Sequence, residues 1–500
     1  MTSEQLMGII VFLPLLAAIT TGLFSKRPNV REGASIGVGV LLFMLCCTLA
    51  RSVFAGARPE FLLATPIVGE HSAAFEIAFR AEPLGAMFSL VASGLWIATT
   101  CYAIGYMRGH QEINQTRFFA CFAIAIFAAM GAAFAKNVFT LFVFYEVMTL
   151  STYPLVTHHG TDKAKQGGRI YLTILLTTSI ALFMLALVWT WSLAGTLNFE
   201  PGGILSKPFA DGKITSTQLA ILLGLFAFGT GKAALMPMHR WLPAAMVAPT
   251  PVSALLHAVA VVKVGVFTVM KVAVYVFGID LLRETNVSVW LMYAASFTIL
   301  CASLIAMTKD NLKARLAYST ISQLSYIVLG ASLANPAGVL GGSVHIVMHA
   351  VGKITLFFCA GAIYVAAHKT DISQMRGIGR RMPFTMIAFL LGSLSIIGLP
   401  PFGGSWSKWL LAMGAADTEH PWLMAVLMIS SLLNIAYLLP ISIQAFFAED
   451  DSSSQTVVRM HEAPAMCVVP LCLTAVGGVL LFLFADRIYL ALEPIAKVTL

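Results

Sequence analysis

The stretch VFTLFVFYEVMTLSTYPLV, residues 138–156, decides the fold because it combines a bilayer-length apolar run with one acidic side chain. Its length matches the ~20 residues that an α-helix needs to cross a membrane. Glu146 lies near its middle, whereas the other Asp and Glu residues fall near the ends of apolar runs or in the polar gaps between them. A charge at mid-membrane costs several kcal/mol, so such a residue is usually functional.

Similar apolar runs fill most of the chain. It is 58% hydrophobic and 11% charged, with a mean hydropathy of +0.85, whereas a soluble protein is about 25% charged. The runs are continuous rather than alternating, which disfavours a transmembrane β-barrel. We therefore expect an all-α polytopic membrane protein with about 14 transmembrane helices, forming a single integral membrane domain over residues 1–500.

The positive charges between the predicted spans indicate the orientation. Most of these lysines and arginines follow odd-numbered spans, as at residues 26–27 and 380–381. The positive-inside rule places these loops in the cytoplasm and both termini on the outer side of a bacterial inner membrane. The same rule accounts for the net charge of +8. No basic patch is interleaved with exposed aromatic residues, so we expect no nucleic acid partner.

Two predicted helices contain clusters of glycine and proline beside a lysine. GTGKAALMPMHRWLP, residues 229–243, surrounds Lys232, and GLPPFGGSWSKW, residues 398–409, contains Lys408. Glycine and proline weaken helices, so we predict that helices 7 and 12 are broken. The breaks lie five spans apart, and an odd offset inverts the second half. We therefore predict two inverted five-helix repeats, residues 117–277 and 287–447, although glycine and proline are also common in ordinary membrane helices.

Five lysines lie inside apolar stretches: Lys232, Lys263, Lys271, Lys353 and Lys408. Burial and a nearby opposite charge act in opposite directions on proton affinity, so a close Glu146–Lys232 pair can switch protonation; a static ion pair between two helices is the alternative. Lys263 is too deep in its span to reach water, whereas Lys271 is expected to extend its ammonium to the interface. Lys271 and His257 are accessory candidates, and the spacing of His257 from Lys263 directs the two side chains differently.

A further set of titratable residues occurs in SVHIVMHAVGKITLFF, residues 343–358. His345, His349 and Lys353 follow the spacing i, i+4 and i+8, which places them on one helical face. Histidine can accept a proton on one ring nitrogen and release one from the other, so this face is suited to a proton relay. Two alternatives are structural histidines and a zinc site, but no acid or cysteine lies nearby in sequence, so we expect no metal.

These stretches resemble the antiporter-like proton-translocating subunits shared by respiratory complex I, Mrp-type Na⁺/H⁺ antiporters (the large, D-like subunit) and membrane-bound hydrogenases. The resemblance covers roughly residues 83–412, and PTPVSALLHA at residues 249–258 is its most specific part. Some relatives carry glutamate where this chain has Lys408. The resemblance implies a proton relay of Glu146 on helix 5, Lys232 on helix 7, Lys263 on helix 8, His345, His349 and Lys353 on helix 11, and Lys408 on helix 12.

We therefore expect a proton-translocating membrane subunit of a multi-subunit Mrp-type cation/proton antiporter. The alternative is a proton-pumping subunit of a complex-I-like NADH–quinone oxidoreductase or membrane-bound hydrogenase; an inert scaffold is disfavoured by the cost of its buried charges. The sequence contains no motif for NADH, flavin, iron–sulfur or quinone binding, and no CxxC pair. We expect no cofactor, and expect as partners other membrane subunits, including homologous antiporter-like ones, H⁺, Na⁺ and the lipid bilayer.

Overall fold

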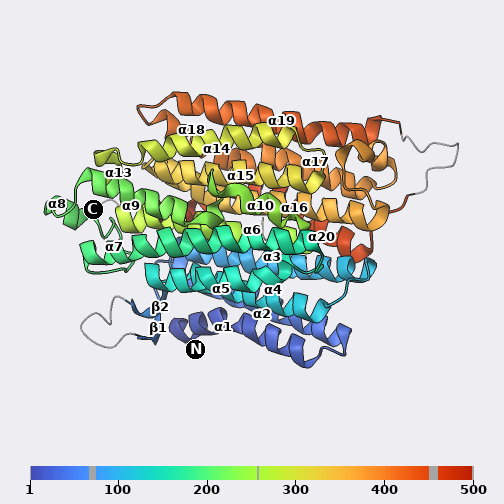
Figure 1. Ribbon diagram of the computed structural model, residues 1–500, viewed down its shortest axis with the longest axis horizontal. Coiled ribbons are helices and arrows are strands. Elements are labelled where there is room, and N and C mark those ends of the chain that lie inside the picture. Colours follow the sequence, from blue (N-terminus) through green and yellow to red (C-terminus); the bar gives the residue numbers. More distant parts are fainter. Residues whose placement is uncertain (1, 67–74, 256–257, 259, 450–459, 498–500) are drawn as a thin grey trace.

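Long helices packed side by side make up the molecule. The computed structural model of the protein describes residues 2–66, 75–255, 258, 260–449 and 460–497. Figure 1 shows the helices running nearly parallel, with α1 and α2 at one edge and α19 at the other. Within the described residues, ten helices are long and apolar enough to cross a membrane. They are α1 (Ser3–Leu23), α2 (Pro28–Phe54), α3 (Pro83–Gly109), α4 (Gln115–Ala133), α5 (Val138–Val156), α6–α7 (Asp162–Ala194), α14 (Val289–Met307), α16 (Pro336–Ala367), α19 (Trp422–Phe447) and α20 (Ala465–Leu483).

Shorter helices and one small sheet complete the described chain. α6 (Asp162–Thr178) continues through a π-helical turn into α7 (Met184–Ala194), and β1 (Glu60–Ala64) pairs antiparallel with β2 (Ile77–Arg80), Phe61 facing Phe79. The other helices are α8 (Ser206–Ala210), α9 (Ser216–Gly229), α10 (Trp241–Ala244), α11 (Thr250–Ala254), α12 (Val261–Lys271), α13 (Ile279–Thr285), α15 (Leu312–Ser332), α17 (Pro383–Ile397), α18 (Gly404–Ala416) and α21 (Ala485–Ala496).

α16 is the central helix of the bundle. In its most apolar window 94% of the residues are buried inside the molecule, compared with 33% for α2 and for α20. A helix that is apolar on all sides is stable only when it is surrounded by others. α2 and α20 instead keep apolar side chains such as Leu473 exposed, as expected of helices that face lipid.

Asparagine caps fix where three helices of the interior begin. The side-chain oxygens of Asn137, Asn311 and Asn335 each accept a hydrogen bond from a backbone N–H in the first turn of α5, α15 and α16. Such caps satisfy one of the otherwise unpaired N–H groups at a helix start. The Asn335 amide also donates to the Gly414 carbonyl at 2.7 Å, which ties α16 to α18.

Both glycine–proline clusters interrupt their helices. α9 ends at Gly229 and is followed by a 3₁₀ turn, Gly231–Ala233, that carries Lys232. α17 ends at Ile397, and α18 begins only at Gly404. Gly398 between them has φ +88°, a left-handed conformation that glycine adopts without steric cost.

The number of spans differs from the sequence expectation. Ten uninterrupted helices qualify in the described residues, or eleven when the α12 segment and α13, which bend by 79° at Gly278, are counted as one span. The predicted spans outside this set are either broken, as at α9 and α17–α18, or polar, as in α15. The last predicted span, 464–491, is two helices, α20 and α21. The figure of fourteen and the two repeats therefore stay predictions.

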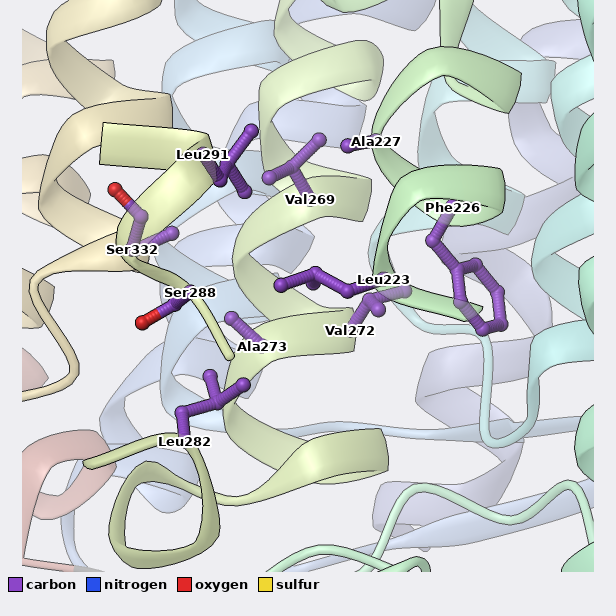
Figure 2. A pocket seen from close by; sticks show the side chains of 11 residues that line it. Leu223, Phe226, Ala227, Val269, Val272, Ala273, Leu282, Ser288, Leu291 and Ser332 are labelled. Atoms are coloured by element: carbon purple, nitrogen blue, oxygen red, sulfur yellow. The ribbon is translucent and has the colours of Figure 1, made fainter. Parts of the chain in front are cut away.

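A small apolar cavity lies between α9, the α12 segment and α14. Figure 2 shows it lined by hydrocarbon side chains such as Leu223, Val269 and Leu291, together with Ser288 and Ser332. Its volume is about 10 Å³, near the lower limit for a single water molecule. It has no titratable residue in its lining, so the functional site lies elsewhere.

Candidate functional site: a buried series of ionisable groups

Lys232 is held against α5 by two hydrogen bonds, one to a residue before Glu146 in the sequence and one to a residue after it. Its ammonium donates to the Tyr145 carbonyl at 2.9 Å and to Thr149 Oγ1 at 2.6 Å. It also lies 3.1 Å from the centroid of the Tyr145 ring, a cation–π contact. The break after α9 makes this possible, because the 3₁₀ turn brings the fully buried lysine directly onto the neighbouring helix.

The static Glu146–Lys232 ion pair, which was the alternative to a switchable pair, is not formed in the structure. Within the described residues, no carboxylate oxygen lies within 4.0 Å of the Lys232 ammonium, and both oxygens of Glu146 are buried without a hydrogen-bond partner. The carboxylate remains within electrostatic range of the ammonium. A backbone carbonyl and a hydroxyl of α5 bind the lysine instead, and the side-chain oxygens of Glu146 have no hydrogen-bond partner.

Lys263 and His349 are two titratable side chains in direct contact inside the described part of the bundle. Lys263 Nζ, on α12, lies 2.6 Å from His349 Nδ1, on α16. Both side chains are buried. An amine and an imidazole at this distance share one hydrogen bond, so a proton can pass directly between them.

The histidine face of α16 continues from this contact toward α18. The rings of His349 and His345 are stacked with centroids 5.7 Å apart. His345 Nδ1 forms a hydrogen bond of 2.8 Å with Ser407 Oγ on α18, and its ring stacks on Tyr326 of α15. The predicted helical face therefore brings Lys263, both histidines and α18 together.

Lys353, the third residue of this face, turns toward α15 and α19. Its ammonium donates to Ser319 Oγ at 2.6 Å and lies 3.4 Å from the Leu316 carbonyl. Ser319 also accepts a hydrogen bond from the Tyr437 hydroxyl at 2.8 Å. Lys353 is thus on the same helix as the histidines but has a separate set of partners.

Lys408 lies at the end of the series, beside the second break. Its ammonium donates to the Ile397 carbonyl at 2.9 Å and to Ser431 Oγ at 3.1 Å. It is half-buried and lines a groove of about 730 Å³ that also contains the exposed Trp406 and Trp409. Lys408 therefore borders a groove that opens at the surface of the chain.

The Lys232 and Lys263 side chains have separate hydrogen-bond partners, although their backbones lie side by side. Gly265 of α12 packs directly on the backbone of Lys232, so the two elements touch. In the part of the chain that the structure describes, no hydrogen bond links the Lys232 and Lys263 side chains. His257, the accessory candidate nearest in sequence to Lys263, lies outside the described residues.

Comparison with known proteins places the chain in a family. Residues 135–434 match the family model described as NADH:quinone oxidoreductase/Mrp antiporter, transmembrane. The chain belongs to this NADH:quinone oxidoreductase/Mrp antiporter family.

Curated relatives of this chain include subunits of quinone oxidoreductases. NADH-quinone oxidoreductase subunit N of Desulforudis audaxviator is 30% identical over 418 residues, covering 81% of this chain and 82% of the relative. NAD(P)H-quinone oxidoreductase chain 5 of Synechocystis is 29% identical over 432 residues, covering 81% of this chain and 60% of the relative. The chain thus spans most of the first relative but under two thirds of the second.

Two solved membrane complexes each contain a chain whose fold matches that of this protein over its full length. A chain of the Mrp complex from Dietzia sp. DQ12-45-1b superposes with a TM-score of 0.86 at 21% identity, covering 100% of this chain and 98% of the other. A chain of the archaeal membrane-bound sulfane sulfur reductase gives 0.84 at 22%, covering 99% and 98%. Family membership and the apolar helices together make the protein an integral membrane protein.

Lys271, the other accessory candidate, has an acidic partner in the structure. Its side chain is buried inside the protein, with 1% of its surface exposed. The ammonium is 3.2 Å from Glu82 Oε2 and donates to the Ala135 carbonyl at 2.9 Å. Glu82 is also held by Arg80 at 2.8 Å. The sequence placed Glu82 in a polar gap, but packing of the α3 start against α12 buries it and supplies a counter-ion for Lys271.

Sequence reasoning also missed the polar residues of α15 and α19. Ser319 contacts Lys353, Tyr326 contacts His345, and Tyr437 binds Ser319, yet none of the three is charged. One signal was available: Ser319, Ser322, Gln323 and Tyr326 follow the spacing i, i+3, i+4 and i+7, which marks one face of a helix.

Metal ligands do not gather in the described part of the chain. Among residues 2–66, 75–255, 258, 260–449 and 460–497, no group of three or more His, Cys, Asp or Glu side chains is arranged to hold an ion. All eight cysteines are free thiols. The chemistry of the series is therefore that of amines, imidazoles, hydroxyls and one carboxylate, all suited to proton transfer.

Proposed function

We propose that this chain is a proton-translocating membrane subunit of a multi-subunit Mrp-type cation/proton antiporter. The observation that supports it most is the contact of 2.6 Å between Lys263 and His349, inside a buried series that ends at Lys408 beside an open groove. Buried cations without acidic partners are costly and persist mainly where they carry function. Among the described residues, no carboxylate pairs with Lys263, Lys353 or Lys408.

In this proposal the Glu146–Lys232 region is the gate. When Lys232 binds Tyr145 and Thr149, Glu146 is an unpaired acceptor that can take up a proton. When the lysine moves to the carboxylate, the ion pair favours the charged forms of both groups. The gate therefore couples the movement of one side chain to proton uptake and release.

The route beyond the gate follows the series. Protons enter from the cytoplasm near Lys232 and Lys263, pass along the histidine face of α16, and leave through Lys408. Water molecules bridge Lys232 and Lys263. The fourteen-span topology, the inverted repeats at residues 117–277 and 287–447, and a bacterial inner membrane location with both termini outside belong to the same proposal. The two interrupted helices, each with a lysine beside the break, support the repeats.

The second candidate is a proton-pumping subunit of a complex-I-like NADH–quinone oxidoreductase or a related hydrogenase. The 30% identity with a quinone oxidoreductase subunit N favours it. The relay would be the same in both cases, and the partners would differ. Mass spectrometry of the intact purified complex separates them: small hydrophobic and homologous antiporter-like subunits indicate antiport, whereas peripheral cluster-binding subunits indicate redox pumping.

The gate is tested by Glu146→Ala and Lys232→Ala in the complete assembly. Both variants should abolish cation-dependent proton movement in everted membrane vesicles, measured by a pH-sensitive dye, while the subunits still co-purify. Lys163→Met, at an exposed position, is the control and should transport normally. Full transport by both gate variants would refute the function proposed for this pair.

A further inference from the structure

One face of α15 is polar although it is completely buried. Ser319, Ser322, Gln323 and Tyr326 lie on this face, and the exposed fraction of each is 0%. Burying hydroxyl and amide groups without hydrogen bonds costs about 1–3 kcal/mol each. Each of these groups therefore needs a partner, and together they mark a polar strip through the bundle interior.

At one end, the strip is joined to Lys353. The Lys353 ammonium donates to Ser319 Oγ at 2.6 Å, and the Tyr437 hydroxyl donates to the same oxygen at 2.8 Å. Tyr437 also contacts the side-chain oxygen of Asn434, one turn earlier on α19. This end thus brings one amine, two hydroxyls and one amide into a continuous set of contacts.

At the other end, the strip is joined to Lys408. The Lys408 ammonium donates to Ser431 Oγ at 3.1 Å and lies 5.1 Å from the centroid of the Tyr326 ring. The Tyr326 hydroxyl donates to the Leu427 carbonyl at 3.4 Å, and Ser430 and Ser431 follow three and four residues later on α19. Ser303 of α14 connects Ser430, at 3.4 Å, with Ser322 of the α15 face, at 2.9 Å.

The two ends are separated by about one helical turn. Asn434 and Ser430 are four residues apart on α19, and Ser319 and Ser322 are three apart on α15, spacings of about 5–6 Å. Gln323 lies on the same α15 face within this interval. Both polar atoms of its amide, and Nδ2 of Asn434, are buried without a hydrogen-bond partner in the structure. An interval of this length matches one or two water molecules, which are the usual partners of such atoms.

We propose that Gln323 and Asn434 bind water that joins these two ends into a second proton path from Lys353 to Lys408. The path rests on the proposed function and runs alongside the histidine branch of His349, His345 and Ser407. A proton leaves the Lys353 ammonium, each hydroxyl or water in the chain accepts one proton and passes on its own, and the Lys408 amine receives one. The Gln323 amide orients the water and does not itself transfer a proton.

Tyr437→Phe is the first test, because it removes one hydroxyl and keeps the ring. In vesicles carrying the complete assembly, the rate of cation-dependent proton movement should fall by about tenfold, less than the ~10²-fold effect of an obligatory proton-transfer group because the histidine branch remains. Tyr102→Phe is the matched control: this buried hydroxyl donates to the Phe358 carbonyl, away from the strip. A rate equal to that of the control would overturn the proposal.

A double variant separates parallel paths from a single one. If the branches are parallel, His345→Leu with Tyr437→Phe should reduce the rate by more than the product of the two single reductions. If the double variant is no slower than the slower single variant, the residues belong to one path and the proposal fails. Lys408→Met distinguishes this result from failure of the whole function, because it should stop transport through either branch.

A structural measurement on the unmodified assembly covers the case in which Tyr437→Phe does not assemble. Cryo-electron microscopy at a resolution that shows bound water should reveal density within hydrogen-bond distance of the Gln323 amide. Apolar side chains packed against both amide atoms would overturn the proposal. In the Gln323→Leu variant the density should be lost, whereas Ser325→Ala, which removes a hydroxyl bonded to its own helix, should retain it.

Discussion

The two helix breaks place a lysine in opposite surroundings. Lys232 is fully buried, bonded to α5 and close to the acidic Glu146. Lys408 is half-buried, has no acidic partner among the described residues, and borders a groove of about 730 Å³. A glycine–proline break beside a lysine therefore leads to two environments. Lys232 is buried close to a carboxylate, whereas Lys408 borders an open groove. In the proposed function, the first break holds the gate and the second holds the outlet.

Among the substitutions in this section, the largest loss of transport is expected at Lys263, which lies between the Lys232 and Lys408 regions in the proposed series. Lys263→Met removes the group that contacts His349 at 2.6 Å, so proton movement in vesicles should fall by about 100-fold or more. Lys207→Met, at an exposed position of α8, should transport normally. Transport within twofold of the unmodified assembly would show that the gate and the outlet do not depend on Lys263.

Lys271, an accessory candidate for the relay, provides a contrast because it has an acidic partner. Glu82→Gln leaves Lys271 buried without its ion pair, and breaking such a pair costs about 3–5 kcal/mol. The melting temperature of the purified assembly should fall, while the rate per assembled complex stays close to normal. Glu200→Gln, whose side chain is 48% exposed, should change stability by less than about 1 kcal/mol. A normal melting temperature but slow transport would move Lys271 and Glu82 into the relay.

A small substitution tests how closely α18 packs against α17 at the second break. A Cβ at Gly404 would collide with the Ser395 carbonyl oxygen, so Gly404→Ala must displace α18 and should cost about 1–3 kcal/mol. Gly477→Ala is the matched control, because its nearest neighbour, Val351, would be at 3.6 Å, an ordinary contact. Thermal unfolding of both purified assemblies makes the comparison. Equal melting temperatures of the two variants would mean that α18 does not pack tightly against α17 at Gly404.

The smallest effect is expected from a histidine just beyond α5. Burial, followed by the charge of Arg117 and then His159, lowers the pKa of His158 to about 4. Because this folded-state pKa lies below the ordinary value near 6.5, the unfolded chain binds more protons between pH 6.5 and 4. Stability is therefore complete above about pH 6.5 and decreases as the pH falls through this window. In melting curves from pH 7 to 4.5, His158→Asn should reduce this decrease; an unchanged slope would contradict it.

Much of the site could be predicted because its signals are local. A charged residue inside an apolar run is visible without any structure, and a spacing of four residues places His345 and His349 on one face of any helix. The breaks after Gly229 and Ile397 were also predictable, since glycine and proline disfavour the helix through their own backbones. The span count was less predictable, because a broken or polar helix needs neighbours to remain in the membrane.

The sequence by itself determined that this protein is a helical membrane protein with ionisable groups in its interior, and where two helices are interrupted. These properties follow from hydropathy, periodicity and backbone preference, which act between residues close in the chain. Only the tertiary structure decided which groups meet: Lys232 with Thr149 rather than Glu146, Lys271 with Glu82, and Lys353 with Ser319. Such contacts join segments far apart in the chain, so they depend on how whole helices pack.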